Sequence, residues 1–147
     1  MRAISKLGTV AILSVSLNAF ADAPGSVPAA PAAPAAAPAS APVRTILERH
    51  EQTGVAGKEI VLGTAFLPGG SVIDFHTHPG DEVGMVLKGP LVLRRKGEPD
   101  RVLKTGDTFF NARGVVHSVA AQPGSDATAV STWIVDKGQP LATPAPK

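Results

Sequence analysis

Residues 76–82 read His-Thr-His-Pro-Gly-Asp-Glu, and they hold two of the four histidines in the 147-residue chain. Side chains at positions i and i+2 of a β-strand point to the same face, so a strand here presents His76 and His78 together. Pro79, Gly80 and Asp81 predict a turn after that strand. A hairpin would then return Glu82 to the side of the two imidazoles. The pattern predicts one point at which two nitrogens and a carboxylate oxygen meet.

A third histidine is expected in the same pocket. It is His117, within Gly-Val-Val-His-Ser-Val, whereas His50 lies in a charged segment and is expected to be exposed. Imidazole and carboxylate without sulfur favour a borderline divalent metal, which is Fe, Mn, Ni, Cu or Zn. Three histidines and Glu82 would leave coordination positions open for water or substrate, as in catalytic sites. For an isolated His-x-His, incidental histidines on a surface strand are the competing interpretation.

The first 21 residues have the layout of a secretory signal peptide. Arg2 and Lys6 precede a mostly apolar segment, and Ala19-Phe20-Ala21 places small residues where a signal peptidase reads them. Cleavage before Asp22 would deliver the protein to the periplasm or outside the cell. The apolar segment 7–20 is shorter than the roughly 20 residues that span a bilayer, so no membrane association is expected after removal of the signal.

Residues 22–42 are rich in alanine and proline. Proline interrupts helices and alanine offers little apolar area, so a disordered linker is expected here. The folded domain is predicted to comprise residues 43–137, and a loose tail is expected at 138–147.

The composition excludes several classes of function. The chain has 14 Lys and Arg, 12 Asp and Glu and no Cys, so disulfides, thiolate ligands and cysteine nucleophiles are excluded. Arg2 and Lys6 are the only charged residues in 1–21, and without them the basic and acidic residues balance. No basic field for nucleic acid remains. The dense basic run, residues 94–96, precedes a turn sequence and is expected at a solvated hairpin tip.

Residues 43–137 are predicted to be all-β. Short β-branched and apolar runs alternate with glycine, proline and aspartate, and no stretch keeps a 3.6-residue period for three turns. Many short strands between turn signals favour an antiparallel sandwich or barrel. Residues 45–53 are the exception, because a short helical turn is an alternative there.

The sequence around His76 resembles the first motif of the cupin family. That motif is a glycine, five residues, His-x-His, three or four residues, Glu, six residues and a glycine. This chain matches every fixed position, with Gly70, His76, His78, Glu82 and Gly89.

The second cupin motif is a glycine, five residues, Pro-x-Gly, two residues, His, three residues and Asn. Gly106, Gly114 and His117 match it, whereas Ala112 replaces the proline and Ala121 replaces the asparagine. Neither replaced residue is a metal ligand in the family. The resemblance covers roughly residues 43–136 and is strongest to the small single-domain bacterial cupins.

The resemblance implies a conical antiparallel β-barrel, which is the jelly-roll-like double-stranded β-helix of the cupins, with one divalent transition metal ion inside. The ligands carried over are His76, His78, Glu82 and His117, and Glu82 could be a ligand or a proton shuttle. A homodimer is expected from the resemblance alone.

Several neighbouring positions carry two interpretations. Gly84 either leaves space beside the metal or marks a bulge. Trp133, the only tryptophan, either lines the pocket or packs in the barrel. The apolar residues near the motifs favour an apolar ligand, but such residues are more often plain core: Val72, Phe75, Met85, Val86, Phe109 and Val119.

Three functions are compatible with such a site, because one fold hosts many chemistries. The first is a dioxygenase-like oxidoreductase, in which the metal binds a small organic substrate and oxygen. The second is an isomerase or lyase, in which the metal polarises a carbonyl. The third is a non-catalytic periplasmic protein that binds a small molecule or a metal.

Overall fold

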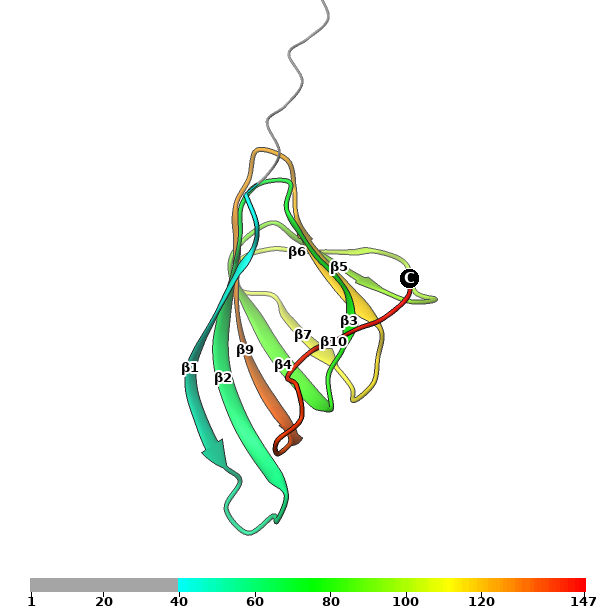
Figure 1. Cartoon of the computed structure of the whole chain (residues 1–147). Helices are drawn as coiled ribbons and strands as arrows, with labels where there is room; N and C mark the ends of the chain where they lie inside the picture. Colours follow the sequence, from blue (N-terminus) through cyan, green and yellow to red (C-terminus); the bar gives the residue numbers. More distant parts are fainter. Residues whose placement is uncertain (1–39) are drawn as a thin grey trace, which may run out of the picture. The chain divides into compact units, whose positions relative to one another are not determined.

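The structure is a computed structural model, and it describes residues 40–147 (Figure 1). The predicted signal peptide and nearly all of the predicted linker lie outside the described residues. The described part consists of strands joined by turns: β1 Val43–Glu51, β2 Lys58–Leu67, β3 Val72–Thr77, β4 Gly80–Lys88, β5 Leu91–Arg95, β6 Arg101–Leu103, β7 Thr108–Asn111, β8 His117–Ala121, β9 Ala127–Asp136 and β10 Thr143–Pro144. Within residues 40–147 no helix is long and apolar enough to cross a membrane.

The strands form two antiparallel sheets, which confirms the predicted all-β barrel of jelly-roll type. One sheet has the order β1-β2-β9-β4-β7 and the other has the order β10-β3-β8-β5-β6. The chain crosses between the sheets several times, for example from β2 to β3 and from β3 to β4 (Figure 1). Such crossing is the topology of a double-stranded jelly roll.

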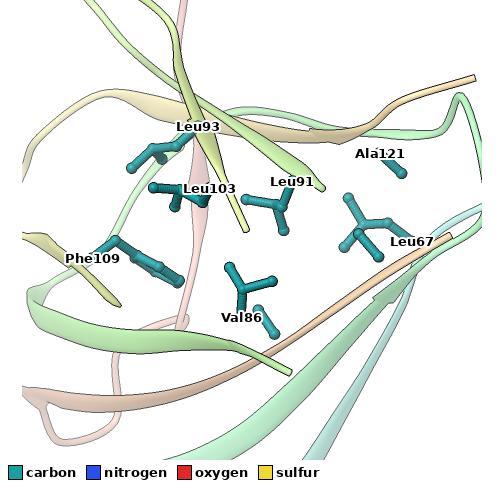
Figure 2. Close-up of a cluster of buried hydrophobic side chains, with 9 residues drawn as sticks. Leu67, Val86, Leu91, Leu93, Leu103, Phe109 and Ala121 are labelled. Carbon is teal, nitrogen blue, oxygen red and sulfur yellow. The ribbon is translucent and has the colours of Figure 1, made fainter. Parts of the chain in front are cut away.

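A cluster of leucines, alanines, one valine and one phenylalanine fills the space between the sheets (Figure 2). Leu67 on β2, Val86 on β4 and Phe109 on β7 come from one sheet. Leu91 and Leu93 on β5 face them from the other sheet. The predicted core positions Val86 and Phe109 are therefore confirmed.

The predicted hairpin at Pro79 is wrong. β3 pairs with β8 and β10, whereas β4 pairs with β7 and β9, so the two strands belong to different sheets. His78 and Pro79 carry the chain from one sheet to the other. Gly80 permits this crossing, because a Cβ atom there would lie 1.9 Å from the carbonyl oxygen of Ile134. Glu82 still faces the histidines, because the two sheets face each other.

The helical alternative for residues 45–53 is also wrong. β1 pairs antiparallel with β2 from Val43 opposite Phe66 to Glu51 opposite Glu59. Without β1, the backbone groups along one edge of β2 would be unpaired. Pairing along that edge satisfies the backbone groups of β1 and overrides the weak local preference.

The C-terminal segment differs from the loose tail that its composition predicted. Thr143 and Pro144 pair with β3 at the edge of a sheet, which is where proline is tolerated in strands. The backbone N–H of Ala145 donates to the carbonyl of Phe75 at 2.9 Å. Leu141 packs against a buried cluster of Val61, Trp133 and Val135. The segment therefore closes one side of the barrel.

Gly84 has a role that neither interpretation anticipated. A Cβ atom at this position would lie 2.2 Å from Cζ of Phe109. Gly84 and Phe109 are directly paired on β4 and β7, without a bulge between them. The glycine makes room for the phenyl ring in the core. Val72 and Met85 are exposed, in contrast to the predicted core.

Candidate metal centre

Three histidines from the two motifs meet inside the barrel. His76 is on β3 and is the strand partner of His117, the first residue of β8, while His78 follows β3. Each of the three is at most 6% exposed. One nitrogen of each ring lies within 4.8 Å of the corresponding nitrogens of the other two. Such a buried cluster has the donor type that binds Zn, Cu, Fe and Ni.

Backbone carbonyls orient all three imidazoles. Nδ1 of His76 contacts the carbonyl oxygen of Asp74 at 2.7 Å, and Nδ1 of His117 contacts the carbonyl oxygen of Val115 at 2.9 Å. Nδ1 of His78 contacts the carbonyl oxygen of Leu141 at 2.6 Å. A carbonyl only accepts, which assigns a hydrogen to each Nδ1. Each Nε2 is then the atom available to a metal, and its direction is fixed by the backbone.

Glu82 completes the group from the opposite sheet. Its Oε2 lies 3.4 Å from Nε2 of His78 and 3.3 Å from Nε2 of His117. Two atoms that each bind one ion at about 2.1 Å in a tetrahedral arrangement are about 3.4 Å apart. These spacings therefore fit donors to a common ion. Glu82 lies on β4, whose alternation turns it inward while Val83 faces solvent.

The Glu82 carboxylate is held in its charged form. Burial alone would raise its pKa, but the adjoining imidazoles of His117 and His78 and a hydrogen bond from Asn111 bring the pKa well below its usual range. The donor in Asn111 is Nδ2, 2.7 Å from Oε2. Arg95 in turn donates from Nε to Oδ1 of Asn111 at 2.8 Å. An arginine and an amide thus fix the orientation of the carboxylate.

His76 is held in its neutral form. Burial lowers its pKa to about 4, the carbonyl of Asp74 opposes this shift, and His117, His78 and Arg44 add to the lowering. A metal binds the neutral imidazole. His76 can therefore act as a ligand without first losing a proton at neutral pH.

Trp133 fulfils both of the roles considered for it. It is buried against Val61 and Val135, and it also lines the cavity beside the histidines. Its Nε1–H donates to Nε2 of His78 at 3.2 Å. A metal bound at Nε2 of His78 would displace the hydrogen bond from Trp133, because the single lone pair of Nε2 can bind only one partner.

Two cavities that share lining residues adjoin the histidines. The inner cavity has a volume of about 30 Å³ and lies between the sheets, with Glu82, His117 and apolar residues such as Phe109 in its wall. The outer cavity, of about 220 Å³, lies beside the C-terminal segment. Both are lined by Arg44, Ile73 and His76. A water molecule needs about 10–15 Å³. The inner cavity therefore has room for water-sized ligands at the open positions of an ion, and the outer cavity has room for a small molecule.

The structure brings together all four predicted site residues, and it adds residues that the sequence did not indicate. His50 is exposed, as predicted, and contacts Glu48. Arg94 and Arg95 end β5, Lys96 lies in the following turn, and the partly exposed Arg94 pairs with Asp100. Arg95 departs from the predicted solvated tip, because its side chain turns inward. Asn111, Arg44 and the carbonyl of Leu141 carry no motif signal, and only the folded chain reveals them.

Comparisons with known proteins agree with this geometry. The family model described as "Cupin domain" matches residues 64–135. The dimethylsulfoniopropionate lyase DddQ of Ruegeria pomeroyi is 30% identical over 63 residues, which are 43% of this chain and 31% of that protein. A germin-like protein of Morus alba is 39% identical over 69 residues, 44% of this chain and 33% of its own. The chain thus spans about a third of the curated relatives it matches.

Solved structures show the same fold at low sequence identity. A double-stranded β-helix protein from Klebsiella pneumoniae has a TM-score of 0.60 and 20% identity, covering 72% of this chain and 85% of that one. Recombinant oxalate oxidase in complex with glycolate has a TM-score of 0.56 and 23% identity, and the match covers 70% of this chain and 54% of that one. The motifs, the family match and these folds together show that the chain belongs to the cupin superfamily.

Proposed function

We propose that this protein is a metal-dependent enzyme that acts on a small organic molecule, with a dioxygenase-like oxidation as the leading reaction class. The observation that carries the proposal is the convergence of three backbone-oriented imidazoles and one charged carboxylate beside a cavity. His76, His78, His117 and Glu82 would hold one ion of Fe, Mn, Zn, Cu or Ni. When bound, that ion supplies Lewis-acid or redox chemistry at its open positions.

The surroundings of the site support chemistry away from bulk water. Leu67, Leu91 and Phe109 line the inner cavity and are buried in the core. An apolar wall excludes water and strengthens electrostatic interactions within the site. Oxalate oxidase, which has the same fold, is an oxidoreductase by name. The apolar wall suits any of the candidate reactions, so the oxidation is proposed on the likeness to oxalate oxidase.

The lowered pKa of Glu82 separates its two candidate roles. A general base works best when its pKa is near the working pH, and a carboxylate with a very low pKa accepts a proton weakly. The same low pKa suits a metal ligand, which must remain ionised. Together with the 3.4 Å and 3.3 Å distances from its Oε2 to Nε2 of His78 and His117, this favours Glu82 as a ligand over a proton shuttle.

A lyase reaction is the second candidate. The observation that favours it is the sequence similarity to DddQ, a lyase by name. A non-catalytic protein that binds a small molecule or a metal is the third candidate, and it shares the same four ligands. These candidates differ in what happens after a substrate binds, which the experiment below separates.

We also propose that the protein works in the periplasm or outside the cell, as its first 21 residues suggest, and that it forms a homodimer. Exposed apolar residues gather on the outer face of the sheet that contains β4, which supports the dimer: Ile60, Phe66, Val83, Met85, Phe110 and Ile134. Sedimentation of the wild type and of a Val83→Lys variant tests it. A monomeric wild type at micromolar concentration would count against a dimer.

The proposed function is tested first by elemental analysis of the mature protein from its native compartment. The double variant His76→Ala/His78→Ala removes two ligands, and His50→Ala is the matched control because His50 is exposed. We expect about one metal ion per chain in the wild type and the control, and none in the double variant. A wild type without metal would contradict the proposal.

The loaded protein is then screened with small organic molecules in an oxygen electrode and by product analysis. Oxygen consumption in proportion to product supports the oxidoreductase. Product formed without oxygen supports the lyase. Saturable binding without product from any compound indicates the non-catalytic alternative.

A further inference from the structure

Arg44 occupies an unusual place for an arginine. It lies on β1, the edge strand, whose other residues are almost all exposed. Arg44 is half-buried and lines both the inner and the outer cavity. Its guanidinium carbon is 5.7 Å from the centre of the Trp133 ring, a distance at which an aromatic face attracts a cation.

The guanidinium of Arg44 has no hydrogen-bond or ion-pair partner among residues 40–147, although charge attraction from Glu82 opposes the lowering of its pKa by burial. Its Nε is buried and forms no hydrogen bond there, and no carboxylate of the described chain forms an ion pair with it. Four of the other five arginines in this part of the chain have such partners: Arg49 pairs with Glu59, Arg94 with Asp100, Arg95 with Glu98 and Arg113 with Asp136. The fifth, Arg101, is exposed to solvent. A buried polar group without a hydrogen-bond partner is costly to folding, so the arrangement points to a ligand.

The charges in the pocket indicate the sign of that ligand. Arg44 carries one positive charge, Glu82 and Asp74 each carry one negative charge, and imidazoles bound to a metal add none. A divalent ion would therefore leave the loaded pocket with an excess of positive charge, which an anion would offset. The planar guanidinium presents paired N–H donors that match the two oxygens of a carboxylate.

We propose, on the basis of the metal site proposed above, that the ligand of this pocket is a small monocarboxylate whose carboxylate is bound by Arg44. His76 and Arg44 line both cavities, so an anion at Arg44 lies beside the metal ligands. The rest of the molecule extends into the outer cavity, where Phe75, Ala142 and Pro144 offer apolar walls. Asp74 also lines that cavity and disfavours a second carboxylate.

Trp133 provides a signal for the test. It is the only tryptophan, the chain has no tyrosine, and the ring lies between Arg44 and His78. Its fluorescence therefore reports on both the metal and the anion. Butyrate is the probe, butyramide its uncharged counterpart and succinate the dicarboxylate. Metal content is measured on every sample before titration by fluorescence and calorimetry.

The variants are Arg44→Gln, Arg44→Lys and, as the matched control, Arg101→Gln, whose residue is exposed on β6 of the other sheet. We expect butyrate to bind the loaded wild type roughly 10- to 100-fold more tightly than butyramide, as for hydrogen bonds to a charged group. Arg44→Gln should abolish this preference, Arg44→Lys should keep part of it, and Arg101→Gln should match the wild type. Succinate should bind more weakly than butyrate.

Equal affinity for butyrate and butyramide would overturn the proposal, as would an Arg44→Gln variant that keeps its metal and its melting temperature and still prefers butyrate. If the wild type retains no metal, the metal site itself fails. The titration then uses the metal-free protein, in which weaker butyrate binding that depends on Arg44 supports the anion site and its absence refutes it.

Discussion

Removal of residues 138–147 tests how far the metal centre depends on the C-terminal segment. The deletion takes away the Leu141 carbonyl that accepts from Nδ1 of His78 at 2.6 Å. It also removes the strand pair with β3 and the packing of Leu141 on Val61 and Trp133. The deletion leaves all four candidate ligands in place, so any change in affinity reports on their orientation.

The expected loss in metal affinity follows from the role of such outer partners. Loss of a group that orients a ligating histidine lowers the affinity about 10- to 100-fold, or about 1.4–2.7 kcal/mol. The fold should also lose about 3 kcal/mol, from two hydrogen bonds at about 1 kcal/mol each and partial exposure of Leu141. Competition with a chelator, followed by Trp133 fluorescence, measures the affinity, and urea unfolding measures the stability.

Two controls separate orientation from packing. Deletion of residues 146–147 keeps every contact described and should change neither quantity. Leu141→Ala keeps the carbonyl but removes the side chain, so it should lower stability by about 1–2 kcal/mol and leave the affinity within about threefold. The reasoning is refuted if the long deletion yields a folded protein that binds metal as tightly as the full chain.

Three further predictions follow from single contacts. Asn111→Ala removes the donor to Glu82 and should weaken metal binding about tenfold, measured by chelator competition; unchanged affinity would show that the amide is dispensable. Gly84→Ala places a methyl group against Phe109 and should lower the free energy of unfolding by about 1–3 kcal/mol, measured by urea unfolding. A urea curve that coincides with that of the wild type would contradict this prediction. The metal-free protein should lose stability as the pH falls from about 6.5 to about 4, because the unfolded chain takes up a proton that native His76 refuses. That loss is on the order of 3 kcal/mol, and it should be smaller in His76→Ala; a flat urea midpoint across this range would contradict it.

The convergence of the four candidate ligands could be predicted because their positions are encoded locally. Strand alternation turns His76 inward, and the motif spacing identifies Glu82 and His117, whichever strands they pair with. The predicted hairpin failed, yet the predicted convergence held. Residues that face each other across two sheets converge just as residues on one sheet do, so the spacing was informative although the assumed pairing was wrong.

The supporting contacts could not be predicted, because they join segments that are distant in sequence. Arg44 and Trp133 are far apart in sequence, as are His78 and Leu141, and only the closed barrel brings them together. The C-terminal segment is rich in alanine and proline, which predicts disorder when no partner is considered. The exposed edge of β3 supplies that partner.

The position of the four candidate ligands has a consequence for the life of the protein. Glu82 belongs to one sheet, and His76 and His117 belong to the other. An ion held between them would connect the two halves of a barrel that has no cysteine to do so. A ligand at 100 times its dissociation constant stabilises the folded state by about 2.7 kcal/mol. Without the ion, the barrel would open more often and the opened chain would be cleaved by proteases more readily. The amount of protein would then follow the supply of its ion.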